Sequence, residues 1–498
     1  MNHITRDKSF SQLTAGLSES SPRGPDVPIL GMTADSRQVR TGYLFVAIPG
    51  FVHDGHDFIA EAITNGAVAV VYQDPSYENA ITNEVAALRV PDTRLALAII
   101  ADRFYDHPSG DLTLVAVTGT NGKTTTVGIV DAIFRAAGYR TGTIGTLGAT
   151  VFDQHLPGDR TTPDAVGLQS LLAEMVGAGV THVAMEVTSH GLDLHRVYQT
   201  SFAAAIFGNL SQDHLDWHET MEAYFASKTV LFTDYVDFSP EMVAAINLDD
   251  PWGRRLAELA RCRVTGYAID AAAEVRACGV RLSPTGSSFT LELPDESLAV
   301  RTSLIGRFNL YNALGAATCC YALGIGASDL VAGLQQAQPA AGRLERVDLG
   351  QPFTVIVDYA HTPEALANVL EAARGLQPRR LICVFGCGGD RDRSKRPKMG
   401  AIATELADLT IITSDNPRSE DPDAIIAEIV TGAAGSSFRV EADRRAAIAE
   451  AVAEAAEGDL VLIAGKGHET YQEGPNGRID FDDRLVAAEL LREHGYGT

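Results

Sequence analysis

The chain has little cysteine, and its six cysteines form no pattern that would hold a metal or a redox pair. None of them stands in a CxxC pair or at the Cys/His spacing of a zinc site. No stretch reaches the ~18 uninterrupted apolar residues of a membrane span, and the polar segment 1–23 lacks the apolar core of a secretion signal. We therefore expect a soluble protein of the reducing cytoplasm rather than a disulfide-bonded or membrane-spanning one.

Positive charge is also scarce. The chain has 40 Lys and Arg against 64 Asp and Glu, which gives a formal net charge of −24. Such a balance repels nucleic acid and anionic membrane surfaces, so we expect neither as a partner. An anionic small-molecule ligand would need locally placed cations or helix N-termini.

The length of 498 residues is too great for one hydrophobic core and suggests about three domains. After short apolar runs in segment 31–108, "DHPSGD" (106–111) resembles a linker, and strand-like runs then alternate with helical ones. The alternation restarts after "QPAAGRLE" (338–345). We predict an α/β fold with a small mixed N-terminal domain (1–108), a central P-loop-type parallel-sheet ATPase domain (109–340) and a Rossmann-like C-terminal domain (341–498).

The strongest motif is "VAVTGTNGKTTT" (115–126), a strand entering a glycine turn and then a helix. Such a turn presents backbone N–H groups and a helix N-terminus to a phosphate, Lys123 could reach the β- and γ-phosphates, and Thr124 could hold Mg²⁺. Gly119 precedes Gly122 by three positions, so the loop is shorter than a standard Walker A motif. A surface turn with an ordinary lysine is the weaker interpretation.

Two polar segments follow neighbouring apolar runs in the same domain. "AMEVTSHGL" places Glu186 at a strand end, and "GNLSQDHLDWH" places His214 after the next strand. Beside a phosphate loop, these groups are suited to bind Mg²⁺ or to hold water. Taken alone, His214 is more often a structural histidine.

Lys228 lies on the apolar stripe of a helical pattern, "MEAYFASKTVLF" (221–232). A buried ammonium is costly unless it is paired or neutralised. Two interpretations stay open at this point: a lysine whose stem reaches the surface, or a lysine of lowered pKa that is carbamylated into an anion.

Further candidate sites lie in the last third of the chain. In "GRFNLYNAL", Asn309 and Asn312 share a helix face and could read a nucleobase, although helix capping by Asn309 is equally consistent. "VDYAHTPEAL" places Asp358 at a strand end. "FGCGGDRDRSKRP" holds Arg391, Arg393, Lys395 and Arg396 directly after a strand, which favours an anion site over a solvated charge run.

Arg418 stands among acids in "TSDNPRSEDP" (413–422), directly after the apolar run 409–412. The carboxyl ends of parallel strands are where ligands bind in open α/β sheets, so Arg418 is expected in a site. We interpret the flanking Glu420 and Asp421 as solvated surface.

Together these motifs resemble those of the Mur ligases, the ATP-dependent amide-forming enzymes of peptidoglycan assembly. "TGTNGKTTT", "MEVTSHGL", "NLSQDHLD", "DYAHTPEAL" and "GRLE" all match, in the family's three-domain order. Within the family the chain is most similar to the MurE type, which adds the third residue of the stem peptide. "DNPR" with "GKGHE" is similar to the form that adds meso-diaminopimelate rather than L-lysine.

The resemblance implies ATP as co-substrate and Mg²⁺ as cofactor. ATP would contact Gly119, Thr120, Asn121, Gly122, Lys123, Thr124, Thr125, Asn312, Arg343 and Asp358. Mg²⁺ would be served by Thr124, Glu186, His214 and a carbamylated Lys228. The implied catalytic residues are Lys123, Lys228, His214 and Glu186.

The resemblance also implies the other two substrates and a monomer. UDP-N-acetylmuramoyl dipeptide would contact Ser36, His53, Asp54, Gly55, Thr161, Thr162, Thr188 and Arg196. Meso-diaminopimelate would contact Arg391, Asp415, Asn416, Pro417, Arg418, Gly465 and Glu469. Arg418 is the residue type suited to the extra carboxylate, Asp415 and Glu469 to the ammonium beside it, and Asn416 to the carboxylate. The chain departs from the family pattern at Thr188, where relatives often have serine, and at Arg160, where asparagine occurs.

Three other functions are weighed against this one. An L-lysine-adding ligase shares the mechanism, and a folylpolyglutamate-type enzyme shares the short phosphate loop but is disfavoured by the complete first domain and by "DNPR". A P-loop ATPase or switch that binds a protein partner leaves the cation cluster, "DYAHTP" and "GKGHE" without a role.

Overall fold

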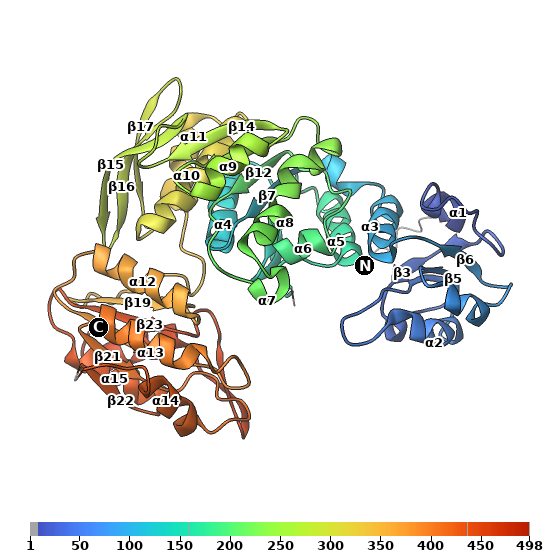
Figure 1. The fold of residues 1–498 in the computed structure, drawn as a ribbon. Helices are drawn as coiled ribbons and strands as arrows, with labels where there is room; N and C mark the ends of the chain where they lie inside the picture. Colours follow the sequence, from blue (N-terminus) through green and yellow to red (C-terminus); the bar gives the residue numbers. More distant parts are fainter. Residues whose placement is uncertain (1–7, 159, 436, 498) are drawn as a thin grey trace. The chain divides into compact units, whose positions relative to one another are not determined.

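The structure is a computed structural model of the chain, and it describes residues 8–158, 160–435 and 437–497. The chain divides into two compact units (Figure 1). Unit 1 comprises the chain up to Arg276 with Leu293–Asp295 and Leu314–Gly333. Unit 2 comprises Ala277–Glu292, Glu296–Ala313 and the chain from Leu334. The predicted domain boundaries at 108/109 and 340/341 stay predictions.

Unit 1 begins with a small four-stranded parallel sheet in the order β3-β4-β5-β6. Its elements are β1 (Lys8–Ser9), α1 (Phe10–Thr14), β2 (Pro28–Ile29), β3 (Gly31–Thr33), η1 (Ser36–Gln38), β4 (Tyr43–Val46), η2 (Gly55–Phe58), α2 (Ile59–Thr64), β5 (Ala67–Tyr72), η3 (Pro75–Ala80), β6 (Ala86–Arg89), α3 (Thr93–Phe104) and η4 (Pro108–Asp111). Adjacent residues of β4 pack into different hydrophobic core clusters, Leu44 on one face of the sheet and Phe45 on the other. Both faces are therefore covered, which explains the continuous apolar strand sequences.

The second part of unit 1 is a larger, mainly parallel sheet in the order β10-β9-β8-β11-β7-β12-β13-β14. Its elements are β7 (Thr113–Thr118), α4 (Lys123–Ala136), β8 (Thr141–Gly145), β9 (Gly148–Val151), β10 (Gln154–Leu156), α5 (Ala165–Gly177), β11 (His182–Glu186), α6 (Ser189–Asp193), β12 (Ala204–Phe207), α7 (Leu215–His218), α8 (Met221–Thr233), η5 (Tyr235–Asp237), β13 (Val243–Asn247), α9 (Pro251–Leu259) and β14 (Arg263–Ala268). β7 pairs in parallel with both β11 and β12. The loops that follow these three strands consequently meet at one edge of the sheet.

The chain then forms β15 (Val275–Ser283), the antiparallel hairpin β16 (Gly286–Glu292) and β17 (Ser297–Thr302), α10 (Arg307–Ala322) and α11 (Ala327–Gln336).

The C-terminal part of unit 2 is a six-stranded sheet in the order β18-β19-β23-β20-β21-β22, in which only the edge strand β18 is antiparallel to its neighbour. Its elements are β18 (Glu345–Val347), β19 (Thr354–Asp358), α12 (Pro363–Gly375), β20 (Leu381–Phe385), α13 (Lys395–Leu406), β21 (Leu409–Ile412), α14 (Pro422–Val430), β22 (Phe438–Val440), α15 (Arg444–Glu454), β23 (Leu460–Ala464), β24 (Tyr471–Gly474), β25 (Gly477–Asp480) and α16 (Asp483–Glu493). Because β23 lies between β19 and β20, the ends of β19, β20, β21 and β23 line one edge.

Helices cover both faces of this C-terminal sheet. Side chains of α12, α13 and α14 pack with Phe385 in one cluster, and side chains of α15 and α16 pack with Val384 in another. Alternation along β20 sends neighbouring residues to opposite layers. The "LICVF" and "LVLIA" runs are apolar throughout since each strand is buried on both sides.

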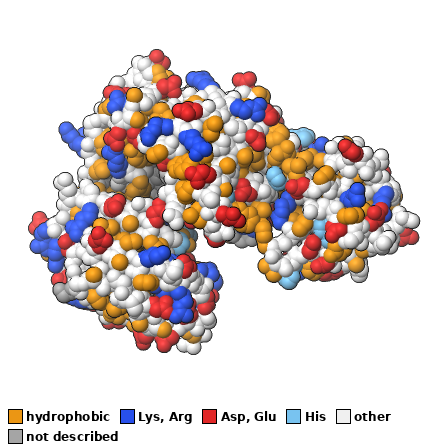
Figure 2. Space-filling model, viewed as in Figure 1, with side chains coloured by type: hydrophobic (Ala, Val, Ile, Leu, Met, Phe, Trp, Pro, Cys, Tyr) orange, Lys and Arg blue, Asp and Glu red, His pale blue; other side chains and the backbone are white. Residues whose placement is uncertain are grey.

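The surface carries mixed charge. Figure 2 shows acidic and basic side chains interspersed over the visible faces of both units. Across the part of the chain that the structure describes, helices are too short or too polar to cross a membrane.

Candidate functional site

The glycine loop after β7 is held in shape by the segment that follows β12. The N–H groups of Thr120 and Asn121 donate to the backbone oxygen and the Oδ1 of Asn209, both at 2.9 Å. A Cβ on Gly119 would lie only 3.2 Å from the same backbone oxygen, and Gly122 has a positive φ of 86° immediately before α4. The loop thus brings the N-terminus of α4 into the open edge of the sheet, where it can bind an anion.

Lys123 and Thr124, which follow this loop at the start of α4, both donate hydrogen bonds. The Lys123 ammonium donates to the backbone oxygens of Gly119 and Thr120 at 3.0 and 2.9 Å. The Thr124 hydroxyl donates to Glu186 Oε1 at 2.9 Å. A lysine anchored on its own loop stays beside the position where phosphate oxygens would face the N–H groups of α4.

Glu186, at the end of β11, is buried and is surrounded by hydroxyl groups. Besides Thr124, it accepts hydrogen bonds from the N–H of Thr146 at 2.8 Å and from its hydroxyl at 3.2 Å. The Thr124 and Glu186 oxygens are hard donors that fit Mg²⁺. Within the described ranges, no group of three His, Cys, Asp or Glu residues is arranged to hold a metal. A metal here would therefore also need oxygens from a phosphate ligand, water or a modified side chain.

His214 follows β12 with a left-handed backbone, φ 54°. Burial is the main cause that lowers its pKa, with Lys123 and Lys228 adding to the effect. The imidazole is therefore neutral near pH 7, which is the form that binds metals.

Lys228, on α8, is buried beneath the glycine loop, with 1% of its surface exposed. Its ammonium donates to the Gly119 backbone oxygen at 3.1 Å and lies 4.7 Å from the ring centroid of Tyr224. The alternative in which its stem reaches the surface is therefore wrong. Burial, and then the charge of Lys123, lower the pKa of Lys228 well below its usual value. A neutral amine is the form that reacts with CO₂, so the environment fits the predicted carbamylation.

The residues predicted for the peptide part of the muramoyl substrate gather next to Glu186. The Thr162 hydroxyl donates to the Glu186 backbone oxygen at 2.9 Å and lies 3.1 Å from the Thr188 hydroxyl. Arg196 donates to the Thr162 backbone oxygen at 3.0 Å, and the Thr161 hydroxyl lies 3.0 Å from that of Thr146. Residues far apart in sequence thus form one polar cluster next to Glu186.

The residues predicted for the UDP-sugar lie in the small N-terminal sheet region. Asp54 caps η2 and lies 2.6 Å from His56 Nδ1, and a Cβ on Gly55 would come 2.6 Å from the backbone oxygen of Ile48. Ser36 is buried and donates to Glu61 at 3.2 Å, while His53 is exposed. Asp54 and Gly55 shape the loop, and the side chains of His53 and Asp54 are both accessible to solvent.

A ring cluster beside His214 was not found from the sequence. The His190 ring lies 4.9 Å from that of His214 and 4.8 Å from that of Trp217, and His218 stacks on Tyr224 at 4.9 Å. His190 belongs to "TSHGL", and Trp217 and His218 belong to "GNLSQDHLDWH", so both motifs held a usable signal, but the contacts between these rings required the structure.

In unit 2, the residues predicted for the nucleotide have local partners. Asp358, at the end of β19, accepts from the N–H of Leu344 at 2.8 Å, and the Arg343 guanidinium lies 4.8 Å from the Tyr359 ring centroid. Asn312 donates to Asn309 Oδ1 at 3.1 Å, and Asn309 donates to the Ile305 backbone oxygen. Asn309 therefore lies inside α10 and bonds the turn before it.

Asp415, just beyond β21, carries the clearest sign of a missing partner. Its Oδ1 accepts from the N–H of Asn416 at 2.7 Å, whereas its Oδ2 is buried and has no hydrogen-bond partner among the described residues. Gly465, at the end of β23, has no side chain to crowd it, since a Cβ there would lie 2.5 Å from Oδ2. A buried carboxylate oxygen without a partner is costly, which points to a cationic ligand.

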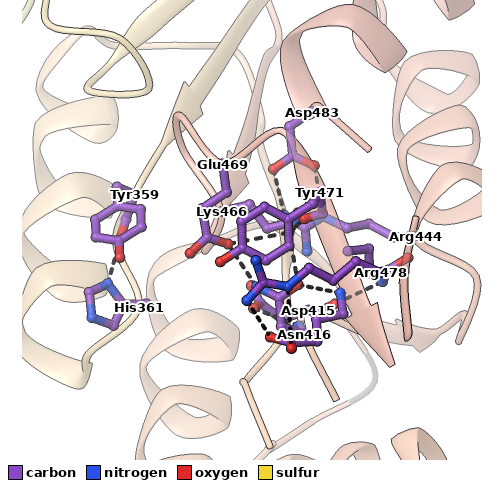
Figure 3. Close-up of polar contacts among 12 residues, drawn as sticks. Tyr359, His361, Asp415, Asn416, Arg444, Lys466, Glu469, Tyr471, Arg478 and Asp483 are labelled. Carbon is purple, nitrogen blue, oxygen red and sulfur yellow. Dashed lines mark hydrogen bonds and ion pairs between the residues drawn. The ribbon is translucent and has the colours of Figure 1, made fainter. Parts of the chain in front are cut away.

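Figure 3 shows Asn416, Lys466 and Glu469 facing one another beside Asp415. Asn416 donates to Glu469 Oε2 at 2.7 Å, and the fully buried Lys466 donates to Asn416 Oδ1 at 3.1 Å and to Glu469 Oε2 at 3.3 Å. Asn416 and Glu469 are thus fixed by a lysine that the sequence analysis did not select, although it belongs to "GKGHE".

Arg418 has a left-handed backbone, φ 53°, which is uncommon for a side chain of this size. Its Nη1 donates to the Gly389 backbone oxygen at 2.7 Å, and its Nε lies 3.7 Å from Glu473 Oε2. Pro417 precedes it with its backbone oxygen so near Gly389 that a Cβ would overlap it at 1.9 Å. Backbone strain of this kind concentrates at ligand sites. The segment after β20, which contains Gly388 and Gly389, therefore leaves room for the Arg418 side chain. Arg391, in the same segment, is exposed.

The interpretation of the cation cluster as one anion site is wrong for Arg393 and Arg396, which pair with carboxylates of the fold. Arg396 is fully buried and bonds Glu420 Oε1 and Glu428 Oε2, both at 2.8 Å, and Arg393 pairs with Glu428 as well. Lys395 donates to the His361 backbone oxygen at 2.8 Å. Arg396 is therefore used inside the fold, whereas Arg393 forms its ion pair at the surface.

The interpretation of the flanking acids as solvated surface is wrong for Glu420 and holds for Asp421, which is exposed. Glu420 pairs with the buried Arg396, and the Asp421 side chain caps α14 by accepting from the N–H of Asp423.

Comparison with known families gives three matches along the chain. Residues 28–105 match a model described as "Mur ligase family, catalytic domain", residues 117–320 match "Mur ligase middle domain", and residues 342–467 match "Mur ligase, glutamate ligase domain".

Similar proteins cover almost the whole chain. A protein of Syntrophomonas wolfei named UDP-N-acetylmuramoyl-L-alanyl-D-glutamate--2,6-diaminopimelate ligase is 46% identical, over 94% of this chain and 96% of its own. One of the same name from Geobacillus kaustophilus is 45% identical, over 95% and 96%. A solved structure of a ligase of that name superposes with a TM-score of 0.74 at 32% identity, covering 98% of this chain and all of the other. A MurF structure from Acinetobacter baumannii, at 20% identity and a TM-score of 0.63, shows the fold alone.

The Glu420–Arg396 pair predicts a pH-dependent stability. Hydrogen bonds from Arg396, and then from the N–H of Asp390, lower the pKa of Glu420 from 4.5 to about 2. A depressed pKa contributes stability above the unfolded value, and that contribution is lost as the pH falls from about 4.5 toward about 2. Glu420→Gln should therefore melt below the wild type at about pH 6, and the difference should shrink by about pH 3.

Thermal unfolding at both pH values checks this, with Glu489→Gln in an exposed pair with Arg445 as the control that should change little. A difference between Glu420→Gln and the wild type that stays constant across this range would contradict the assignment.

Proposed function

The chain belongs to the Mur ligase family, and we propose that it joins meso-diaminopimelate to UDP-N-acetylmuramoyl-L-alanyl-D-glutamate at the expense of ATP, in peptidoglycan precursor synthesis. The observation that carries the proposal is the 46% identity, over 94% of the chain, to a ligase of that name. The geometry agrees with it, because one unit carries a glycine loop before a helix N-terminus, and the other carries the buried Asp415 with an unfilled oxygen and, three residues later, Arg418 with its strained backbone.

The reaction needs an activated carboxylate, since amide formation from a free carboxylate is uphill in water. A carboxylate oxygen of the substrate's D-glutamate attacks the γ-phosphorus of ATP, the bond from that phosphorus to the ADP oxygen breaks, and an acyl phosphate forms. The ammonium of the amino acid loses one proton, and the neutral amine nitrogen attacks the acyl carbon. The bond from that carbon to the phosphate oxygen breaks, the nitrogen loses a second proton, and the amide and inorganic phosphate result. No protein nucleophile is required.

The protein's part in the first step is to position charge. Lys123 and the N-terminus of α4 would hold the ATP phosphates, and the cluster of Thr162, Thr188 and Arg196 would hold the peptide next to Glu186. Fixed donors in a partly buried site stabilise the transferring phosphoryl group more than water can. Thr124, Glu186, His214 and carbamylated Lys228 would hold Mg²⁺, which supplies charge neutralisation between the phosphates when bound.

In the second step, the C-terminal site would present the amine. Asp415 Oδ2 and Glu469 would accept hydrogen bonds from the ammonium at one stereocentre of meso-diaminopimelate, and Arg418 would pair with the carboxylate there. L-lysine lacks that carboxylate and would leave Arg418 without its partner. Sites built around such a pair can reject the shorter analogue by ~10⁴ or more. The full contact sets of all three substrates, the monomeric state and the cytoplasmic location stay predictions.

The substrate assignment predicts when phosphate is released. With ATP, Mg²⁺ and UDP-muramoyl dipeptide present, phosphate release should depend on meso-diaminopimelate and should be slight with L-lysine. A coupled phosphate assay with each component omitted in turn provides the measurement. Equal rates with L-lysine would favour the lysine-adding alternative, and release that needs neither amino acid nor peptide would favour an ATPase.

Arg418→Ala should raise the KM for meso-diaminopimelate by about one to two decades, because a charged hydrogen bond contributes roughly 1.5–3 kcal/mol. The KM for ATP should stay within about twofold, since ATP would bind through other residues. Steady-state kinetics with each substrate varied gives both values. Arg445→Ala, which removes an exposed arginine of α15 paired with Glu489 and Glu493, is the matched control. An unchanged KM for the amino acid in Arg418→Ala would contradict the role.

Lys228 carbamylation predicts a dependence on CO₂. Activity of the wild type should fall in CO₂-depleted buffer at mildly acidic pH and return when bicarbonate is added, because the carbamate hydrolyses and re-forms. Lys228→Met should lose at least about a hundredfold in kcat, a loss typical of removing an electrostatic group at phosphoryl transfer, and should not respond to bicarbonate. A fully active Lys228→Met enzyme would contradict the assignment.

A further inference from the structure

Arg444, the first residue of α15, has a fully buried side chain inside the C-terminal sheet region and belongs to none of the predicted contact sets. Its Nε and Nη2 donate to the two carboxylate oxygens of Asp483, both at 2.8 Å, and Asp483 is buried at the start of α16. Figure 3 shows this fork pointing toward Asp483. The pair joins the first turns of the two helices that cover one face of the sheet.

The same guanidinium reaches two strand ends. Nη1 donates to the backbone oxygen of Ser414 at 3.1 Å, and Nη2 donates to that of Ala464 at 3.0 Å. Ser414 directly precedes Asp415, and Ala464 directly precedes Gly465. One side chain therefore spans the ends of β21 and β23 at the two positions that form the site of the unfilled Asp415 oxygen.

The Gly465 backbone, the Asp415 carboxylate and the Arg444 guanidinium leave no room for an additional atom. An ideal Cβ on Gly465 would lie 2.5 Å from Asp415 Oδ2 and 3.8 Å from Arg444 Nη2, so the glycine, the carboxylate and the guanidinium are closely packed. A shift of either strand end would move Asp415 Oδ2 into Gly465 or away from the ligand position. Residues that hold reacting groups in place affect rates even at about 1 Å of displacement.

Arg444 also keeps its charge in this buried position. Burial alone would lower the pKa of Arg444, but Asp483 and then Asp415 and Glu469 raise it above its usual value, so the side chain stays cationic. A buried ion pair is by itself weak evidence for a role in stability, because replacing it by apolar residues is often neutral or stabilising. Here the positive charge lies behind two carboxylates that would face an incoming ammonium.

We propose that Arg444, held by Asp483, is a positioning residue for the amino-acid site: it fixes Asp415 and Gly465 at the separation that leaves Asp415 Oδ2 open to the ammonium of the incoming amino acid. This inference rests on the proposed function for the identity of that ligand. Lysine cannot replace the arginine, because an ammonium cannot bond both strand ends and both oxygens of Asp483 in this planar arrangement.

The chain contains a matched control at the opposite ends of neighbouring strands. Arg380 precedes β20 and bonds the buried Asp459, which precedes β23, at 2.8 Å, and it also donates to the Glu454 backbone oxygen at 2.8 Å. Like Arg444, it pairs with a buried aspartate and a backbone oxygen, but it does so at the amino ends of the strands, with 34% of its side chain exposed and with Arg379 also bonded to Asp459. Both pairs support the fold, and only Arg444 borders the site.

The test compares Arg444→Met and Arg444→Lys with Arg380→Met and Arg380→Lys in steady-state kinetics and thermal unfolding. All four substitutions are expected to lower the melting temperature. Only the two Arg444 variants should raise the KM for meso-diaminopimelate, by about tenfold or more, with the KM for ATP within about twofold. If Arg444→Met does not fold, Arg444→Lys keeps the buried charge and decides the question.

A double-mutant cycle with Asp415→Asn separates positioning from general stability. If Arg444 acts through Asp415, the combined increase in KM should be at least about fivefold smaller than the product of the two single increases. Multiplicative effects, or an equal increase in the KM of the Arg380 variants, would overturn the inference.

The wild-type assay distinguishes failure of the function from failure of the inference. If the wild type uses another amino acid instead, the proposed function is wrong. The inference about Arg444 is then tested by the KM of the Arg444 and Arg380 variants for that amino acid. If the wild type releases phosphate without any amino acid, both are overturned.

Discussion

Parallel pairing of neighbouring strands is the constraint on which both candidate sites depend. β7 lies between β11 and β12, so the glycine loop, Glu186 and the Asn209 segment meet although about 90 residues separate the first from the last. In the C-terminal sheet, β23 lies between β19 and β20, and the ends of β21 and β23 are joined by one arginine. A one-residue shift of any of these strands would turn its side chains to the opposite face and move its end away from the site.

Several of the chain's cationic side chains are buried, although the chain as a whole is acidic. Lys228, Arg396, Arg444 and Lys466 are all almost fully buried. Arg396 and Arg444 are matched by carboxylates and Lys466 by a carboxylate and an amide, and they stabilise loops at the ends of β20, β21 and β23. Lys228 differs because its hydrogen-bond partners are a backbone oxygen and the Thr118 hydroxyl and its pKa is strongly lowered. This difference separates the lysine expected to be modified from the cations that hold the fold.

The sequence allowed the α/β class, the phosphate loop and most of the strand ends to be predicted. The reason is local: "VAVTGTNGKTTT" contains its own strand, turn and helix, and buried parallel strands are apolar throughout. Roles that depend on a partner elsewhere were missed or misread. Arg396 looked like part of an anion site because its carboxylates, Glu420 and Glu428, lie on another loop and another helix. Arg444 gave no signal, since its partner Asp483 is 39 residues away.

The sequence by itself determined which chemical groups this protein possesses and which element each one ends or begins. The glycines at 119 and 122 and the helix that starts at Lys123 follow from residue types and spacing alone. Only the tertiary structure decided which of these groups are free to act on a ligand. Asp415 and Glu420 are acids only five positions apart, yet Glu420 neutralises a buried arginine, whereas one oxygen of Asp415 is buried without a protein partner in the described part of the chain. The physical reason is that hydrogen bonding and burial are set by neighbours in space, and sequence distance does not record them.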